Sequence, residues 1–230
     1  MVPQNLSRAT SYLPHWKLPV PYRLAPRKIL NVYLDREMGF PLNFREPDVQ
    51  KLFVERISKY HTFFDVGAHI GTYSILGTIS ENLSIHAFEP HPANLTRLEE
   101  NISTNKAEEQ IKVVPSAVSN VSGEVELQVG RSDSHSIVSS DQDDNKIVVD
   151  STTLDSYSLQ AGVYPDLIKV DVEGAGAALI DGAAKVLEQK PDWLVETHSQ
   201  EEKRAFESAF ESRNYTLNKL SEEQWFATSG

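Results

Sequence analysis

The sequence predicts an α/β fold with a mainly parallel sheet of seven strands, a C-terminal antiparallel hairpin and helices on both faces. Three observations support it. Short apolar runs alternate with amphipathic segments from residue 62 onward, which is the pattern of repeated βα units. A turn flanked by glycines joins the first run to the next segment. Two strand-like runs, 215–220 and 224–227, end the chain and predict the hairpin.

The elements follow one another closely. An amphipathic helix is predicted over 48–60, because apolar residues recur there at helical spacing. The alternation then predicts, in order, strand 62–66, helix 71–80, strand 84–89, helix 92–105, strand 111–115, strand 167–172, helix 173–189, strand 193–198 and helix 201–212. Between these, 124–129 alternates polar and apolar residues as a solvated edge strand does, and 146–153 is another short strand. The Ser- and Asp-rich loop 130–145 is a candidate acceptor-binding element or lid.

Composition limits the class of protein. The chain of 230 residues has 40% hydrophobic and 24% charged residues, which is ordinary for a globular protein. It has no cysteine, which excludes disulfides, thiolate metal sites and cysteine nucleophiles and fits a reducing compartment. We therefore expect a cytoplasmic protein. The N-terminus has no long apolar run, so we expect neither a signal peptide nor a membrane span.

The charge is unevenly distributed along the chain. The net charge is −11, yet residues 1–30 hold five basic residues and no acid, which leaves 17 basic against 33 acidic residues elsewhere. An acidic body repels phosphate backbones, so we expect no nucleic-acid partner. We predict a basic, proline-rich arm over 1–46, extended or irregular with a short strand or turn at 30–34, before a domain over 47–230. The arm could cover the active site, bind an anion, dock a partner or pack on its own domain.

The first strand and its glycine turn predict the cofactor. Gly67 and Gly71 flank the turn, and Glu89 follows 22 positions after Gly67, near the usual distance for an acid that binds ribose hydroxyls. A dinucleotide fingerprint needs a second glycine where His69 stands, because the pyrophosphate approaches the backbone there. S-adenosylmethionine (SAM) has no pyrophosphate, and its ammonium group suits Asp65. The pattern therefore favours SAM over a nicotinamide cofactor.

Five motifs extend this pattern through residues 60–200. They are Phe64–Gly71, Ala87–Pro92, Ser116–Ser119, Thr153–Asp155 and Ile168–Gly174. In this order they resemble the FkbM-like methyltransferase family. The resemblance implies a Rossmann-like class I methyltransferase fold with SAM as cofactor. It also implies O-methylation of a small molecule, a sugar or a natural-product intermediate as the expected activity.

The resemblance also implies roles for individual residues. The turn from Asp65 to Gly71 would hold the methionine part of SAM, Glu89 the ribose, and the segment at Ser116 the adenine region. Asp171 would face the methyl-transfer site. The complete predicted cofactor set is Asp65, Gly67, Ala68, His69, Gly71, Thr72, Glu89, Pro90, Ser116, Ala117 and Asp171.

Two positions depart from the family pattern. The family usually has asparagine where His69 stands, which implies that one cofactor contact is changed or lost. It usually has a second acid where Gly176 stands. If that acid serves acceptor binding or helix packing in the family, this chain performs that role in another way.

Polar residues at two strand ends are the catalytic candidates. If the strands over 167–172 and 193–198 are neighbours, then Asp171, Glu173, Glu196 and His198 lie at the same edge of the sheet. His198 is the preferred general base, because histidine titrates near neutral pH, and the alternative is a histidine that bonds locally at a strand end. Asp171 would position the cofactor or acceptor. Glu173 is either catalytic or an acid that favours a helix N-terminus.

A divalent cation could also be held at this edge. Asp171 with Glu196 or His198 would offer suitable ligand atoms. Their spacing in the sequence is not diagnostic of a metal site, so we predict no metal.

These observations together predict a SAM-dependent O-methyltransferase that acts on a hydroxyl of a small molecule or sugar. Two alternatives stay open at this point. One is a non-catalytic protein that binds SAM or a partner, which the missing acid at Gly176 permits. The other is an NAD-dependent oxidoreductase, which His69 disfavours. The sequence leaves the acceptor and the oligomeric state open.

Overall fold

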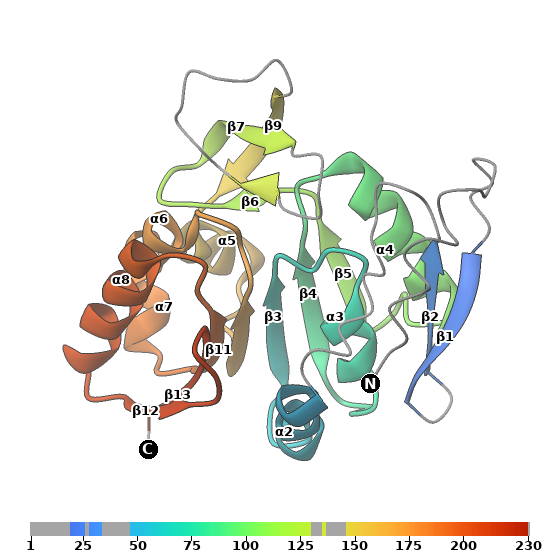
Figure 1. Cartoon of the computed structure of the whole chain (residues 1–230), viewed down its shortest axis with the longest axis horizontal. Coiled ribbons are helices and arrows are strands. Elements are labelled where there is room, and N and C mark those ends of the chain that lie inside the picture. Colours follow the sequence, from blue (N-terminus) through green and yellow to red (C-terminus); the bar gives the residue numbers. More distant parts are fainter. Residues whose placement is uncertain (1–18, 26–27, 34–46, 130–134, 137–145, 230) are drawn as a thin grey trace, which may run out of the picture.

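A seven-stranded sheet forms the centre of the computed structural model, which describes residues 19–25, 28–33, 47–129, 135–136 and 146–229 (Figure 1). The strands lie in the order β12-β13-β11-β10-β3-β4-β5. Their bounds are β3 Thr62–Val66, β4 Ser84–Phe88, β5 Ile111–Val114, β10 Leu167–Val170, β11 Asp192–Glu196, β12 Thr216–Lys219 and β13 Gln224–Thr228. β13 is antiparallel to both of its neighbours, and the pairs among β11, β10, β3, β4 and β5 are parallel. The predicted seven-stranded sheet with its C-terminal hairpin is confirmed.

Helices cover both faces of this sheet. One face packs against α2 (Pro47–Ile57), α3 (Thr72–Gly77) and α4 (Pro92–Thr104), and the other against α5 (Leu154–Ala161), α6 (Gly176–Asp181), α7 (Ala184–Glu188) and α8 (Gln200–Glu211). Successive residues of a strand point to opposite faces, so Phe63 enters the first core and Phe64 the second. Strands buried on both faces read as continuous apolar runs, which explains why the alternation in the sequence was readable.

The single helix predicted over 173–189 is wrong, because the structure has two short helices there with a break at Gly182. A Cβ at Gly182 would lie 2.3 Å from the carbonyl oxygen of Ser119, so the chain passes too close for a side chain. The Gly182 carbonyl accepts a hydrogen bond from the N–H of Asp155 at 3.1 Å. The carboxylate of Asp155 in turn accepts the N–H of Lys185 at 3.0 Å, which satisfies a free donor at the start of α7.

A second, four-stranded sheet follows β5 directly and lies above the carboxyl ends of the central strands in Figure 1. Its order is β6-β9-β7-β8, with bounds β6 Ala117–Val118, β7 Gly123–Val129, β8 His135–Ser136 and β9 Lys146–Thr152. The prediction of an edge strand holds over 124–127, where β7 pairs only with β9 among the described residues, and is wrong at 128–129, where β8 pairs on the other side. Alternation of polar and apolar residues indicates that one face of a strand is solvated. It does not show which other strands pair with it, because these lie elsewhere in the sequence. The candidate loop over 130–145 lies outside the described residues except at 135–136.

Part of the predicted N-terminal arm is a β-hairpin of β1 (Pro19–Ala25) and β2 (Lys28–Tyr33). Asn105, just after α4, anchors it: its side-chain oxygen accepts the N–H of Ile29 at 2.9 Å, and its amide donates to the Ile29 carbonyl. Ala25 packs against the core on the side of α2–α4. This segment therefore packs on its own domain, while the rest of the arm lies outside the described residues.

Among the helices described, none has the length and apolar character needed to cross a membrane.

Candidate active site

The predicted cofactor turn begins at a buried carboxylate. Asp65 is 1% exposed, and its Oδ2 accepts a hydrogen bond from the Ser74 hydroxyl of α3 at 2.6 Å. Its Oδ1 is buried with no hydrogen-bond partner among the residues that the structure describes. Burial raises the pKa of Asp65 above its ordinary value. An unpaired buried acceptor is costly, so this oxygen fits a ligand that brings a cation, as the ammonium group of SAM would.

The backbone of the turn has the unusual conformations that the glycines predicted. Gly67 and Gly71 have φ values of 78° and 91°, and His69 has a φ of 54°, in the left-handed region that asparagine and histidine tolerate better than most residues. A Cβ at Gly67 would lie 1.9 Å from the backbone oxygen of Asp171. Only a glycine at position 67 therefore lets the chain after β10 approach the turn so closely.

Glu89, directly after β4, is 5% exposed, and its carboxylate accepts three hydrogen bonds. Its Oε2 accepts the N–H of His69 at 2.9 Å, and its Oε1 accepts the N–H of His91 at 2.8 Å and the side-chain amide of Asn94 at 3.2 Å. Burial raises the pKa of Glu89 to about 7. The acid predicted to bind ribose therefore also holds the glycine turn in place.

The remaining predicted cofactor residues lie in the segments that follow β3, β4 and β5. Ala68 N–H donates to the Phe88 carbonyl at 2.9 Å, and Ser116 N–H donates to the Val114 carbonyl at 2.8 Å. Of the others, Thr72 begins α3, Pro90 lies between β4 and α4, and Ala117 begins β6.

A buried lysine lies behind the predicted catalytic edge. Lys169 on β10 is 5% exposed, its Nζ lies 3.1 Å from Oδ2 of Asp171, and the ammonium lies 4.8 Å from the ring centroid of Tyr73. Burial by itself lowers the pKa of Lys169. Three neighbouring carboxylates outweigh burial and raise that pKa: Asp171, Asp65 and Glu196. The ammonium is therefore charged, and it compensates an otherwise acidic site.

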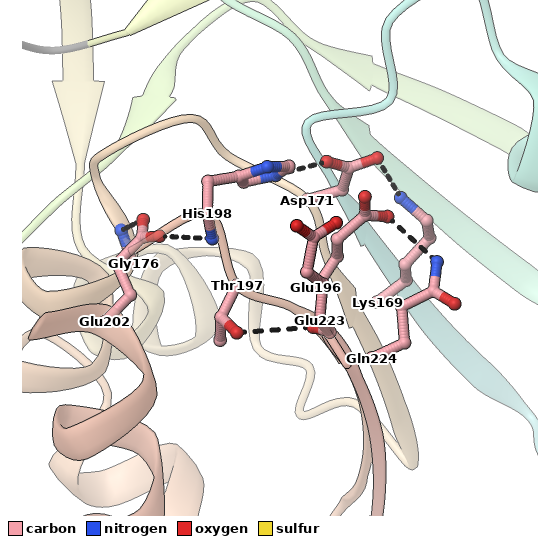
Figure 2. Close-up of polar contacts among 9 residues, drawn as sticks. All are labelled: Lys169, Asp171, Gly176, Glu196, Thr197, His198, Glu202, Glu223 and Gln224. Atoms are coloured by element: carbon pink, nitrogen blue, oxygen red, sulfur yellow. Dashed lines mark hydrogen bonds and ion pairs between the residues drawn. The ribbon is translucent and has the colours of Figure 1, made fainter. Parts of the chain in front are cut away.

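Asp171 and His198 form an ion pair at the carboxyl ends of β10 and β11, as Figure 2 shows. Nε2 of His198 lies 3.1 Å from Oδ1 of Asp171, and the two side chains are 27% and 29% exposed. The hydrogen bond to Asp171 raises the pKa of His198 to about 9, although burial opposes the shift. Burial alone would raise the pKa of Asp171, but Lys169 and His198 hold it well below its usual range. At neutral pH the Asp171–His198 pair is therefore an imidazolium beside a carboxylate.

The two other predicted acids lie close to this pair. Glu196 accepts a hydrogen bond from the side-chain amide of Gln224 on β13 at 3.2 Å. Glu173 contributes to the raised pKa of His198, so its charge acts on the pair. The first turn of α6, which begins at Gly176, contains no acid. Glu173 therefore lies before the helix, and its alternative role inside a helix N-terminus does not apply.

One set of side chains here could hold a metal ion. Asp171, Glu196 and His198 each offer a ligand atom, and these atoms lie within 4.8 Å of one another. Lys169 and His198 already contact both oxygens of Asp171, so that carboxylate has its charge compensated without a metal. We retain the prediction of no metal.

Three residues that support the site were not predicted from the sequence. Lys169 interrupts the apolar run of β10, and a charge inside a buried strand signals a buried partner. Asn94 and Gln224 carry no such signal, because they act through contacts that only the folded chain brings together.

The family profile described as "Methyltransferase FkbM domain" matches residues 65–221. The chain belongs to the FkbM methyltransferase family. The matched range contains the predicted cofactor turn, Glu89 and both members of the Asp171–His198 pair. Membership confirms the predicted family and identifies SAM as the cofactor of this domain. It also removes the support for the nicotinamide alternative.

The chain is also similar to a curated methyltransferase. It is the hexuronic acid methyltransferase AglP of Haloferax volcanii, which is 26% identical over 157 residues. The alignment covers 67% of this chain and 63% of that protein. The chain thus aligns with less than two thirds of the length of this relative.

Solved structures confirm the class I methyltransferase fold. TYW2 of P. horikoshii, solved in complex with MeSAdo, superposes with a TM-score of 0.54 at 12% identity and covers 94% of this chain and 73% of that one. A precorrin-6y C5,15-methyltransferase from Geobacter metallireducens superposes with a TM-score of 0.50 at 12% identity, covering 78% and 84%. At such identities the similarity extends to the fold alone.

Proposed function

We propose that this protein is a SAM-dependent O-methyltransferase that methylates a hydroxyl of a sugar. The observation that carries the proposal is the place of the Asp171–His198 pair. It lies at the sheet edge where the backbone of Asp171 passes against Gly67 of the cofactor turn. A base and a cofactor turn at one edge suit methyl transfer. The hexuronic acid methyltransferase among the relatives supports a sugar acceptor.

The residues of the edge fit SAM. Oδ1 of Asp65 is a buried acceptor without a hydrogen-bond partner among the described residues, which suits the ammonium group. Glu89 presents a carboxylate 22 positions after Gly67, where ribose hydroxyls bind in folds of this kind. The carboxylates of Asp65, Asp171, Glu173 and Glu196 outnumber the two cations Lys169 and His198, so the edge favours a positively charged donor.

The chain's contribution to the reaction is proton removal and alignment. When bound, SAM supplies an electrophilic methyl group whose bond to sulfur breaks, with the electron pair left on sulfur, as the acceptor oxygen bonds to the carbon. Asp171 accepts the Nε2–H of His198 and so leaves Nδ1 as the basic nitrogen. His198 then takes the hydroxyl proton of the acceptor onto Nδ1. Alignment and exclusion of water supply the rest of the rate enhancement.

The state of His198 predicts the pH dependence of the reaction. A general base must be neutral, and the pKa of His198 is raised to about 9, so we expect kcat/KM to rise with pH up to about 9 and then to level off.

The raised pKa of His198 also makes the free energy of unfolding depend on pH, with the opposite trend. The ion pair stabilises the folded state fully below the ordinary histidine pKa of about 6.5, and this contribution is lost as the pH rises through about 9. Rate profiles and urea denaturation from pH 6 to 10 measure both. A rate independent of pH would exclude His198 as the base.

The acceptor class is tested directly by methyl transfer. We expect labelled methyl from SAM to enter hexuronic acids and their glycosides, and not proteins or tRNA. Because a hexuronic acid carries both hydroxyl and carboxylate groups, the product should be treated with mild base, which removes a methyl ester and leaves an ether. A base-stable product supports the proposal, whereas a base-labile product would show that the carboxylate is methylated. SAM binding without transfer to any acceptor would favour the non-catalytic alternative.

A further inference from the structure

Glu202 is a buried acid that the proposed reaction does not use. It belongs to the first turn of α8 and is 2% exposed. Its Oε1 accepts the N–H of Gly176 at 2.9 Å, and its Oε2 accepts the N–H of His198 at 2.7 Å. Figure 2 shows its carboxylate between these two backbone groups. Bonds of this kind to an ionised carboxylate are about twice as strong as neutral ones.

These two hydrogen bonds do more than cap a helix. In a capping box, the acid three residues into the helix returns to the N–H of the N-cap residue. Here the N-cap is Ser199, whose hydroxyl accepts the N–H of Glu202 at 3.1 Å. The carboxylate instead reaches His198, one residue earlier, and crosses to Gly176 at the start of α6. Glu202 therefore joins the segment after β11 to the segment after β10.

These segments carry the two members of the Asp171–His198 pair. Asp171 follows β10 directly and lies five residues before Gly176, and His198 lies two residues after the end of β11. The ladder between β10 and β11 ends at Val170 and Val195, so no ladder pair fixes the separation of Asp171 and His198. A carboxylate bonded to both segments supplies that constraint.

The surrounding packing makes room for this carboxylate. A Cβ at position 176 would lie 3.0 Å from Oε1 of Glu202 and 2.9 Å from a ring carbon of Phe206. A glycine at 176 therefore leaves the space that the Glu202 side chain fills. The family pattern has an acid at position 176, where this chain has glycine. Here a carboxylate also lies against the backbone of residue 176, but it comes from α8.

We propose that Glu202 is a positioning residue, which holds His198 against Asp171 by binding the backbone on both sides of the pair. The proposal rests on the function proposed above for that pair. Loss of the carboxylate lets the two segments separate, so that the imidazole loses the hydrogen bond to Asp171 at 3.1 Å.

The test compares Glu202→Gln with Glu201→Gln. Both substitutions remove one negative charge from the first turn of α8, but Glu201 is exposed. Because both oxygens of Glu202 accept N–H groups, glutamine must direct its own NH₂ at one of these donors. In Glu202→Gln we expect the pKa of His198 to fall from about 9 toward its ordinary 6.5, and kcat to fall about 10- to 100-fold with SAM affinity unchanged. Glu201→Gln should match the wild type in both.

The histidine titration is read from imidazole NMR signals, assigned with His198→Gln. Gly176→Ala is the second variant, because it crowds the carboxylate without changing charge and so carries the test if Glu202→Gln fails to fold. We expect the same two changes in it, with smaller size. If His198 titrates as in the wild type in folded Glu202→Gln or Gly176→Ala, Glu202 only stabilises α8 and the proposal is overturned. The titration needs no acceptor, so it decides the role of Glu202 even if methyl transfer to sugars is not found.

Discussion

Replacing Glu89 with alanine is expected to weaken SAM binding about 100-fold, as measured by isothermal titration calorimetry. A hydrogen bond to a charged group contributes about 1.5–3 kcal/mol, and the ribose offers two hydroxyls to this carboxylate. The substitution also removes the acceptor that holds the N–H of His69, so the glycine turn loses its anchor. Both effects act in the same direction.

The control for this experiment is Glu99→Ala, which removes an exposed acid from the neighbouring helix α4. It should bind SAM as the wild type does. The pH dependence provides a second readout, because the pKa of Glu89 is raised to about 7 and the ionised carboxylate is the better acceptor. SAM affinity should therefore fall by up to tenfold per pH unit below 7 in the wild type, and this dependence should vanish in Glu89→Ala. Wild-type affinity in a folded Glu89→Ala would show that the ribose binds elsewhere.

Replacing Asp171 with alanine should have the largest effect of any single substitution at the catalytic edge. Lys169 is buried and would lose the carboxylate 3.1 Å from its ammonium. Removing one member of a buried ion pair costs about 3–5 kcal/mol. Because Asp65 and Glu196 also face this ammonium, we expect the free energy of unfolding to fall by about 3 kcal/mol, at the low end of that range. Methyl transfer should fall at least 10²-fold, since His198 loses its orienting partner.

The double variant Lys169→Met with Asp171→Ala separates these two effects. It removes both charges of the buried pair, so urea denaturation should show most of the lost stability restored. The rate of methyl transfer should stay low, because His198 still lacks Asp171. Recovery of activity together with stability would mean that Asp171 serves only to compensate Lys169, and a single variant as stable as the wild type would contradict the buried pair.

The sheet and the glycine turn could be predicted from the sequence, because both depend on local patterns of residues. Strands buried on two faces read as apolar runs, and a turn that must pass within contact of another backbone needs glycine, as Gly67 does against Asp171. Most predicted element ends agree with the structure within three residues. The break at Gly182 and the pairing of β7 with β9 escaped prediction, since each depends on a segment distant in the chain.

The sequence by itself determined the fold class, the family and the glycine turn after β3, because short contiguous segments encode them. Only the tertiary structure decided the electrostatics of the catalytic edge. His198 was predicted as a base near neutral pH, yet its hydrogen bond to Asp171 raises its pKa to about 9. The buried ammonium of Lys169 contacts Asp171 from two positions earlier in β10. The carboxylate of Glu202 accepts the N–H of His198 from the first turn of α8. Such effects depend on distance and burial between side chains, which no local pattern of residues records.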